Sequence, residues 1–356
     1  MGTVKNALPY RDCQRMILDQ AKAQHYLNFA VKLKQELEGP KLEQASQRLE
    51  PEDRQLREAL EWFIDNRETE KAQMLASILS RFWIAKGHVA EGRKLMVRVL
   101  ALPRAKSPST TLGELLYGAG MLAFRQDDNK EAEKLFRESL AISREKNEGP
   151  SIVRALGGLA RIALRDNNYA EVKARSEEAR KIARDIGDEY AESRPLHMLA
   201  AATKMEGDLK HARELYEESL ALAHKLGDEG LESTELDNLG SVALHMGDLH
   251  TAKDRYRQAG ELMYKMKSMY MLPYLPLHFS MVALKERQFE RAVRLLGASE
   301  ALFESSGMTP DPDESVERDR TVSQLRKTVD EAEFNRLWAE GRKLSLDQAV
   351  QFSFQA

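Results

Sequence analysis

The segment GDLKHARELYEESLAL, residues 207–222, returns forty residues later as GDLHTAKDRYRQAGEL, residues 247–262. Both segments begin with Gly-Asp-Leu, carry Ala five residues after the glycine and end in Leu. Self-similarity at a fixed spacing is the sequence signature of repeat architectures, in which similar helical or strand units stack on one another. These two segments therefore predict a longer array built on the same forty-residue register.

Three columns of residues, taken at forty-residue steps, carry the same kind of side chain from one unit to the next. The register runs without insertion from about residue 71 to residue 310, and such agreement is not expected by chance. Two columns hold small or modest side chains, and the third holds only Leu or Ile. The first column is Gly92, Ala132, Val172, Ala212, Ala252 and Ala292, the second is Ser80, Gly120, Ala160, Ala200, Gly240 and Ser280, and the third is Leu102, Ile142, Ile182, Leu222, Leu262 and Leu302.

Each unit predicts a pair of helices. In one unit Leu196 and Leu199 have helical spacing, and Gly207 suits the left-handed residue that ends a helix. The small side chains of the first two columns let paired helices approach closely. Larger residues beside them, such as Phe136 and Tyr216, are expected to fill the space between successive pairs.

Composition narrows the class of protein. The chain has 356 residues, of which 42% are hydrophobic and 31% charged, as in folded soluble proteins. A formal net charge of −3 gives no indication of a nucleic-acid or membrane partner. The single cysteine, Cys13, excludes an internal disulfide and fits a reducing compartment. Because no stretch reads as a membrane span or a secretory signal, we expect a cytoplasmic protein.

The pattern within each unit resembles that of the tetratricopeptide repeat family. One unit supplies Ala200, Ala212, Tyr216 and Ser219 at the spacing that this family uses for its small and aromatic positions. Another unit departs from the pattern at Val172 and Ser176, and the period of forty exceeds the usual 34. The resemblance implies an all-α, right-handed superhelical solenoid of helical hairpins. We expect six such repeats over residues 71–310, an N-terminal helical segment over 1–70 that packs on the array, and a C-terminal helical cap over 311–356.

The C-terminal segment carries its own helix-start signal. Ser345, followed three residues later by Gln348, predicts a capping box at the start of the last helix. Apolar residues around this helix are expected to seal the end of the array. They are Leu325, Phe334, Leu337, Trp338 and Val350.

Both ends of the chain resemble the corresponding parts of bacterial signal-transduction ATPases of the STAND group, the LuxR-type and adenylate-cyclase-linked regulators. This resemblance implies a sensor role in transcription regulation or signalling, with an ATPase domain in the same chain. The present chain has no Gly-Lys dipeptide and therefore no phosphate-binding P-loop of its own. The segments that carry the resemblance are HYLNFAVKLKQELEGP (25–40), RLEPEDRQLREALEWFID (48–65), SRFWIAKGHVAEGRKLMVRVLAL (80–102), FERAVRLLGASEAL (289–302) and FNRLWAEGRKLSLDQAV (334–350).

No catalytic or metal-binding constellation stands out. The eight histidines form no His-Glu-x-x-His motif, and His245 and His250 lie on either side of a turn, which is poor geometry for a metal pair. Cys13 has no recognisable Cys–His arrangement around it. We therefore expect no enzyme activity, no metal and no cofactor.

The concave groove is the expected binding surface. In the tetratricopeptide family this surface is built from the first helix of each pair, and the corresponding positions here are rich in basic and aromatic residues. They predict a groove for an acidic peptide, a protein or a small anionic ligand, held by planar arginine contacts. The alternative is that these arginines pair with glutamates of the second helices and bind nothing. The candidate residues are Arg81, Tyr117, Arg125, Arg154, Arg161, Arg165, Arg194, Lys204, His245 and Tyr274.

Two function classes therefore remain open. The first is the sensor and interaction module of a STAND-type regulator, and the second is a stand-alone scaffold that joins protein partners without an ATPase. Neither hypothesis calls for direct contact with nucleic acid or with a membrane.

Overall fold

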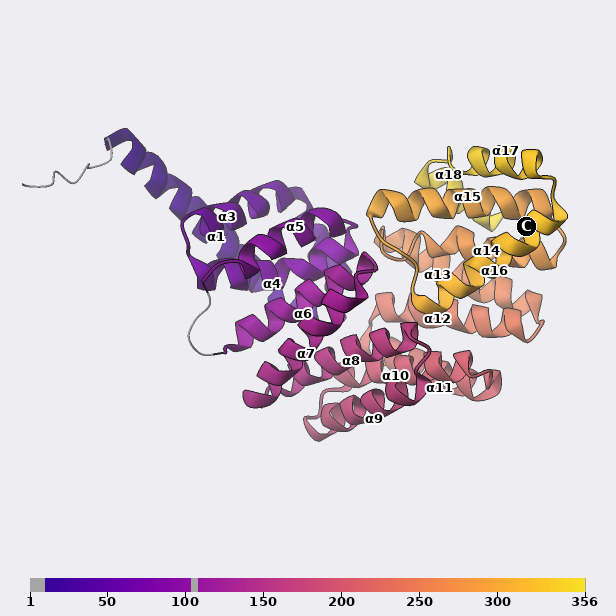
Figure 1. Ribbon diagram of the computed structural model, residues 1–356, viewed down its shortest axis with the longest axis horizontal. Helices are drawn as coiled ribbons and strands as arrows, with labels where there is room; N and C mark the ends of the chain where they lie inside the picture. The colour runs from indigo at the N-terminus through magenta and orange to yellow at the C-terminus, as the bar shows by residue number, and fades with distance from the viewer. Residues whose placement is uncertain (1–9, 104–107, 356) are drawn as a thin grey trace, which may run out of the picture.

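The computed structural model describes residues 10–103 and 108–355, and within these ranges it consists of helices, turns and short connections, without a strand. Figure 1 shows the helices following one another in a curved array, from α1 through α8–α11 to α17 and α18. The predicted all-α solenoid of tetratricopeptide-like hairpins is confirmed. No helix of the described part is long and apolar enough to cross a membrane.

Six helical hairpins form the array, as the forty-residue register predicts. The first helix of each pair, called the A helix below, faces the inside of the curve, and the second is the B helix. The A and B helices of successive pairs are α4 (Thr69–Ala85) and α5 (Val89–Leu100), α6 (Thr110–Arg125) and α7 (Asn129–Glu145), α8 (Gly149–Arg165) and α9 (Tyr169–Asp185), α10 (Glu189–Met205) and α11 (Leu209–Leu226), α12 (Glu229–His245) and α13 (Leu249–Met266), and α14 (Tyr274–Lys285) and α15 (Phe289–Ser306).

The remaining helices lie at the two ends of the array. On the N-terminal side α1 packs on α2, α3 and α4, and on the C-terminal side α17 packs on α15. The division of the chain into three domains stays a prediction. These end helices are α1 (Tyr10–Glu38), α2 (Leu42–Leu49), the 3-10 turn η1 (Glu50–Glu52) and α3 (Asp53–Asp65), followed after the array by α16 (Pro312–Thr328), α17 (Glu331–Gly341) and α18 (Leu346–Phe354).

Small residues on the A helices allow close packing against the B helices, as the sequence predicts. A Cβ atom added to Gly120 would lie 2.6 Å from the ring of Phe136, and one added to Gly158 would lie 2.7 Å from the same ring. Phe136 is fully buried and thus fills the space between its own A helix and the next one. Tyr256 stands in the same relation to Gly240, at 2.7 Å. In the pair α8–α9 the buried Ser176 takes the place of the aromatic ring.

The turns between helices repeat a left-handed residue. Gly207, predicted to adopt this conformation, has a φ of +91°, and non-glycine residues at equivalent turns are also left-handed, among them Asn167 (+55°) and Arg287 (+63°). At several of these turns the next residue caps the following helix, as Asp208 does when it accepts a hydrogen bond from the His211 amide at 3.1 Å. A left-handed conformation costs an L-residue about 1–2 kcal/mol unless it is glycine.

Arg287→Gly is therefore expected to stabilise the protein by about 0.5–1 kcal/mol, after the greater entropy of glycine in the unfolded chain is subtracted. The opposite change, Gly247→Ala, should destabilise it by about 1 kcal/mol, because Gly247 has a φ of +84° at the equivalent turn. Urea denaturation of both variants measures the two effects. Destabilisation by Arg287→Gly would contradict the explanation from backbone strain.

The C-terminal cap forms largely as predicted. Ser345 and Gln348 make the capping box, with Gln348 Oε1 accepting from the Ser345 amide at 2.9 Å. Phe334 and Leu337 are buried, as are Leu325 and Val350. Trp338 is only partly buried and stacks on Phe334 with ring centroids 5.6 Å apart, so its truncation will cost less than that of a fully buried tryptophan.

The array curves until its two ends meet. A Cβ atom on Gly87, in the α4–α5 turn, would lie 3.4 Å from the Cβ atoms of Met269 and Ser306 near the other end. The Thr309 amide, just beyond α15, donates a hydrogen bond to the carbonyl oxygen of Arg125 at the end of α6, at 3.1 Å. The concave side of the array is thereby converted from an open groove into a partly enclosed space.

Candidate functional site

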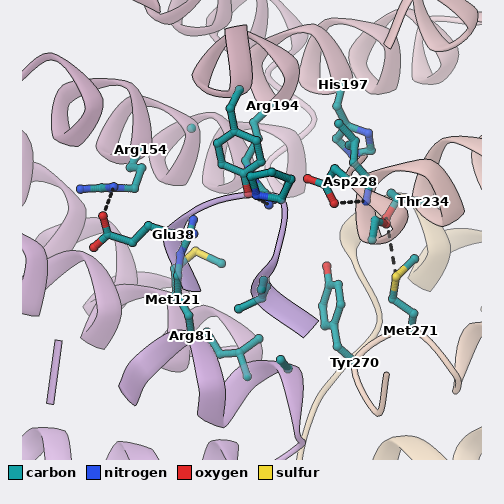
Figure 2. A pocket seen from close by; sticks show the side chains of 18 of the residues that line it. Glu38, Arg81, Met121, Arg154, Arg194, His197, Asp228, Thr234, Tyr270 and Met271 are labelled. Carbon is teal, nitrogen blue, oxygen red and sulfur yellow. Dashed lines mark hydrogen bonds and ion pairs between the residues drawn. The ribbon is translucent and has the colours of Figure 1, made fainter. Parts of the chain in front are cut away.

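The partly enclosed space is a cavity of about 470 Å³ on the concave face. Side chains of the A helices line most of it, and residues near the end of α1, in α2, in the connection between α13 and α14, and at the start of α16 complete the wall. Figure 2 shows side chains from these separate elements arranged around one central space. Seven of the ten predicted groove residues line this cavity, namely Arg81, Tyr117, Arg125, Arg154, Arg161, Arg194 and Tyr274.

Two of the lining arginines have no carboxylate partner. Arg81 donates to the backbone carbonyl of Leu37 at 3.0 Å, and Arg194 donates to the Tyr190 hydroxyl at 3.2 Å. Among the described residues, neither guanidinium has a carboxylate oxygen within ion-pair distance. Both arginines keep donor groups available for a carboxylate or another planar anion.

Positive charge is concentrated around Arg81 and Arg194 on one part of this wall. The Tyr190 hydroxyl raises the pKa of Arg194, so this guanidinium remains protonated throughout the accessible pH range. Burial raises the pKa of Asp228, and the positive charges of Arg194 and Arg81 oppose that rise. Asp228 already caps α12 by accepting from the Leu231 amide at 2.9 Å. The Asp228 carboxylate thus faces two guanidinium groups, and this part of the wall keeps a local positive charge. The lining as a whole holds five arginines and eight Asp or Glu side chains.

Apolar side chains lie next to this charge. Met121, Tyr270 and Met271 line the same cavity, and Met271 is buried with its sulfur 3.2 Å from the Ser233 hydroxyl. Methionine and tyrosine provide adaptable contact area for an apolar group of a ligand. The cavity is therefore suited to a ligand that carries both an anionic group and an apolar side chain.

The other basic residues of the groove are already paired. Arg154 contacts Glu38 of α1 at 3.4 Å and Glu114 at 3.8 Å. Arg125 contacts Asp311 at 2.8 Å, and Arg161 lies 3.8 Å from the same carboxylate. Burial raises the pKa of Asp311, but these guanidinium groups outweigh it and hold the pKa at about 2. Asp311 is therefore a permanent negative charge beside Arg125 and Arg161. The part of the groove that holds Arg125, Arg161, Lys204 and His245 is called its basic half below.

Three predicted groove residues do not line the cavity. Arg165 pairs with Asp127, and its guanidinium lies over the Phe124 ring at 4.2 Å from the ring centre. Lys204 lies 3.7 Å from Glu314, and His245 lies 3.3 Å from Glu317. The predicted continuous basic face is thus divided into a part that borders open space and a part that faces carboxylates of the same chain.

A buried charge cluster lies at the border of the cavity. His278, fully buried on α14, is hydrogen-bonded through Nδ1 to Asp237 at 2.8 Å and through Nε2 to Glu314 at 2.7 Å. Burial lowers the pKa of His278, but the two carboxylates more than compensate and raise it to about 10. The imidazole ring stacks on Tyr256 with centroids 4.8 Å apart. His278 is thus an imidazolium ion held between two carboxylates.

Sequence reasoning missed the acidic residues of this site that lie outside the repeats. Glu38 lies in the N-terminal segment, and Asp311, Glu314 and Glu317 lie beyond the repeats, so the forty-residue register carried no information about them. A signal was present, because Asp311, Glu314 and Glu317 are three residues apart and share one helix face. Within the described part of the chain, no group of three or more His, Cys, Asp or Glu side chains is arranged to hold a metal ion.

Comparison with known proteins agrees with this architecture. Residues 111–185 match the family model described as a tetratricopeptide repeat. Curated protein sequences give no significant match.

Solved structures similar to this one include three complexes. The Rap protein complexed with Competence and Sporulation Factor aligns with a TM-score of 0.59 at 13% identity, over 94% of this chain and 96% of that one. NprR in complex with its cognate peptide NprX aligns with a TM-score of 0.58 at 16% identity, over 76% and 78% of the two chains. The Rap conjugation gene regulator of the plasmid pLS20, in complex with the Phr* peptide, aligns with a TM-score of 0.50 at 13% identity, over 88% and 97%.

At these identities the likeness concerns the fold. Together with the family match, it identifies the chain as a helical array with the architecture of tetratricopeptide-like proteins, in which residues 111–185 carry the repeat signature itself.

Proposed function

We propose that this chain is a non-catalytic sensor and interaction module that binds a short acidic peptide segment, or an equivalent anionic ligand, in the cavity on its concave face. The observation that carries the proposal is the pair Arg81 and Arg194, two guanidinium groups that border open space without a carboxylate partner. The solved complexes named above support a peptide, since each of them contains a peptide or factor bound to a protein of similar fold.

The arrangement explains how such a ligand would be held. A carboxylate placed between Arg81 and Arg194 would make charge-assisted hydrogen bonds in a partly enclosed site, where they are stronger than on an open surface. A neighbouring apolar side chain would contact Met121, Tyr270 and Met271. Each contact alone is modest, and a ligand that makes both is preferred.

The test uses a panel of synthetic hexapeptides that end in a free carboxylate, with their amidated counterparts as the uncharged controls. Peptides that bind the native state should raise the melting temperature with the logarithm of their concentration. The double variant Arg81→Ala/Arg194→Ala should lose this shift, whereas Arg137→Ala should keep it, because Arg137 is 65% exposed on a B helix. Retention of the full shift by the double variant would contradict the proposal.

The biological setting that we propose is a STAND-type signal-transduction regulator, in which this module would sense a signal and an ATPase domain of the same chain would respond. The stand-alone scaffold is the alternative. Sequencing of the surrounding reading frame separates the two, because a P-loop ahead of this region supports the regulator and its absence favours the scaffold.

A further inference from the structure

The first half of α16 lies across the basic half of the groove. Its acidic face, defined here as Asp311, Glu314 and Glu317, contacts basic residues on all five A helices from α6 to α14. Asp311 contacts Arg125 and Arg161, Glu314 contacts Lys204 and His278, and Glu317 contacts His245. All of these basic residues except His278 are among the candidate groove residues that the sequence predicts for an acidic partner.

Charge rather than apolar burial holds this half of the helix. Between Asp311 and Thr321 the only large apolar side chain is Val316, which is 42% exposed. The fully buried apolar anchor of α16 is Leu325, near its other end. The acidic half can therefore leave the groove while the second half keeps its place on the C-terminal cap.

We propose that α16 is an internal acidic ligand of the groove, which competes with external acidic partners for Arg125, Arg161 and Lys204. This inference rests on the proposed function and describes how the same site is regulated. The cavity is bordered by Asp311 and Glu314, so a partner that extends beyond Arg81 and Arg194 meets the acidic face of α16 and must displace it. Because α16 is tethered, its effective concentration at the groove is on the order of millimolar, and weak external ligands are excluded.

Displacement of α16 also opens the ring of helices. The Asp311 amide donates to the Tyr274 hydroxyl at 3.0 Å, and the neighbouring Thr309 amide donates to the Arg125 carbonyl at 3.1 Å. Both bonds join the segment before α16 to the array. A partner that separates Asp311 from Arg125 thus weakens the contact between the two ends of the array. The resulting movement of the two ends can change the position of other domains in a larger protein.

The test asks whether the groove accepts α16 in trans. The probe is a fluorescein-labelled synthetic peptide of residues 309–328, and its binding is followed by fluorescence anisotropy. The full chain with Asp311→Asn, Glu314→Gln and Glu317→Gln should bind the probe about tenfold more tightly than the wild-type chain, whose groove is occupied. The control chain carries Glu131→Gln, Glu133→Gln and Glu171→Gln on exposed parts of B helices and has the same net charge, and it should behave as wild type.

Three further measurements make the result decisive. A probe with the same three neutralising substitutions should not bind. The single variant Asp311→Asn neutralises only one residue of the acidic face and should show an intermediate affinity. It provides the test if the chain with all three substitutions fails to fold. The variant Arg81→Ala/Arg194→Ala/Asp311→Asn should bind the probe as well as Asp311→Asn does, because α16 forms no ion pair with Arg81 or Arg194 among the described residues. The inference would be wrong if the wild-type chain and the chain with Asp311→Asn, Glu314→Gln and Glu317→Gln bound the probe with equal affinity. It would also be wrong if neither this chain nor Asp311→Asn bound the probe. Both outcomes leave the proposed function unaffected.

Discussion

Replacing Gly341 with alanine is expected to lower the free energy of unfolding by about 3 kcal/mol or more. The helices α15 and α17 cross with their backbones in contact. A Cβ atom on Gly341 would collide with the carbonyl oxygen of Arg294, and one on Gly297 would collide with the carbonyl oxygen of Trp338. A carbonyl group inside a helix cannot turn away, so α17 would have to move off α15 and take the buried Phe334 and Leu337 with it. Urea denaturation measures the loss.

The matched control is Gly157→Ala. Gly157 lies within α8, and a Cβ atom placed there meets no other atom within 4 Å. Alanine at such a position raises helix propensity, and we expect a gain of about 0.5–1 kcal/mol. If Gly341→Ala were as well tolerated as Gly157→Ala, the backbone contact between α15 and α17 would be wrong.

The repeats could be predicted because most units bring their paired helices together with similar residues at the same positions. Phe136 requires a glycine opposite its ring on its own A helix and another on the next one, and the sequence records both as Gly120 and Gly158. Nearest-neighbour stacking makes such requirements periodic, so one segment is informative about all the others. The capping box at Ser345 could be predicted for a different reason, since it depends only on residues within one helical turn.

The division of the groove could not be predicted in the same way. Arg81 and Arg161 occupy comparable places on their A helices, yet one borders open space and the other faces Asp311. The difference comes from α16, which is not a repeat and whose path across the groove depends on how far the whole array curves. That curvature is a sum of small rotations between units, which periodicity in the sequence does not encode.

His278→Ala is expected to lower the free energy of unfolding by about 3–5 kcal/mol, because it removes one partner of a buried ionic cluster. The substitution leaves Asp237 and Glu314 facing one another without the imidazolium between them. The matched control is His224→Ala, in which the lost histidine is 58% exposed and lies 3.3 Å from Glu232. An exposed pair of this kind contributes less than about 1 kcal/mol.

Release of α16 differs from this substitution, although both separate Glu314 from His278. When α16 leaves, the Glu314 carboxylate enters water and is solvated there, while His278 keeps its hydrogen bond to Asp237. The remaining imidazolium and carboxylate still neutralise one another. Partner binding can therefore offset the release of α16, whereas no partner contact replaces the imidazolium that His278→Ala removes.

The pH dependence of stability separates His278 from the other histidines. The pKa of His278 is about 10 in the folded chain and about 6.5 in the unfolded one, so the folded chain binds the additional proton between these values. The resulting stabilisation is complete below pH 6.5 and declines as the pH rises towards 10. Urea denaturation at pH 7, 8 and 9 should show a steady loss of stability in wild type and in His224→Ala, and a flatter profile in His278→Ala. A parallel decline in all three chains would mean that His278 is neutral in the folded protein, and Asp237 and Glu314 would then have to share a proton to remain buried side by side.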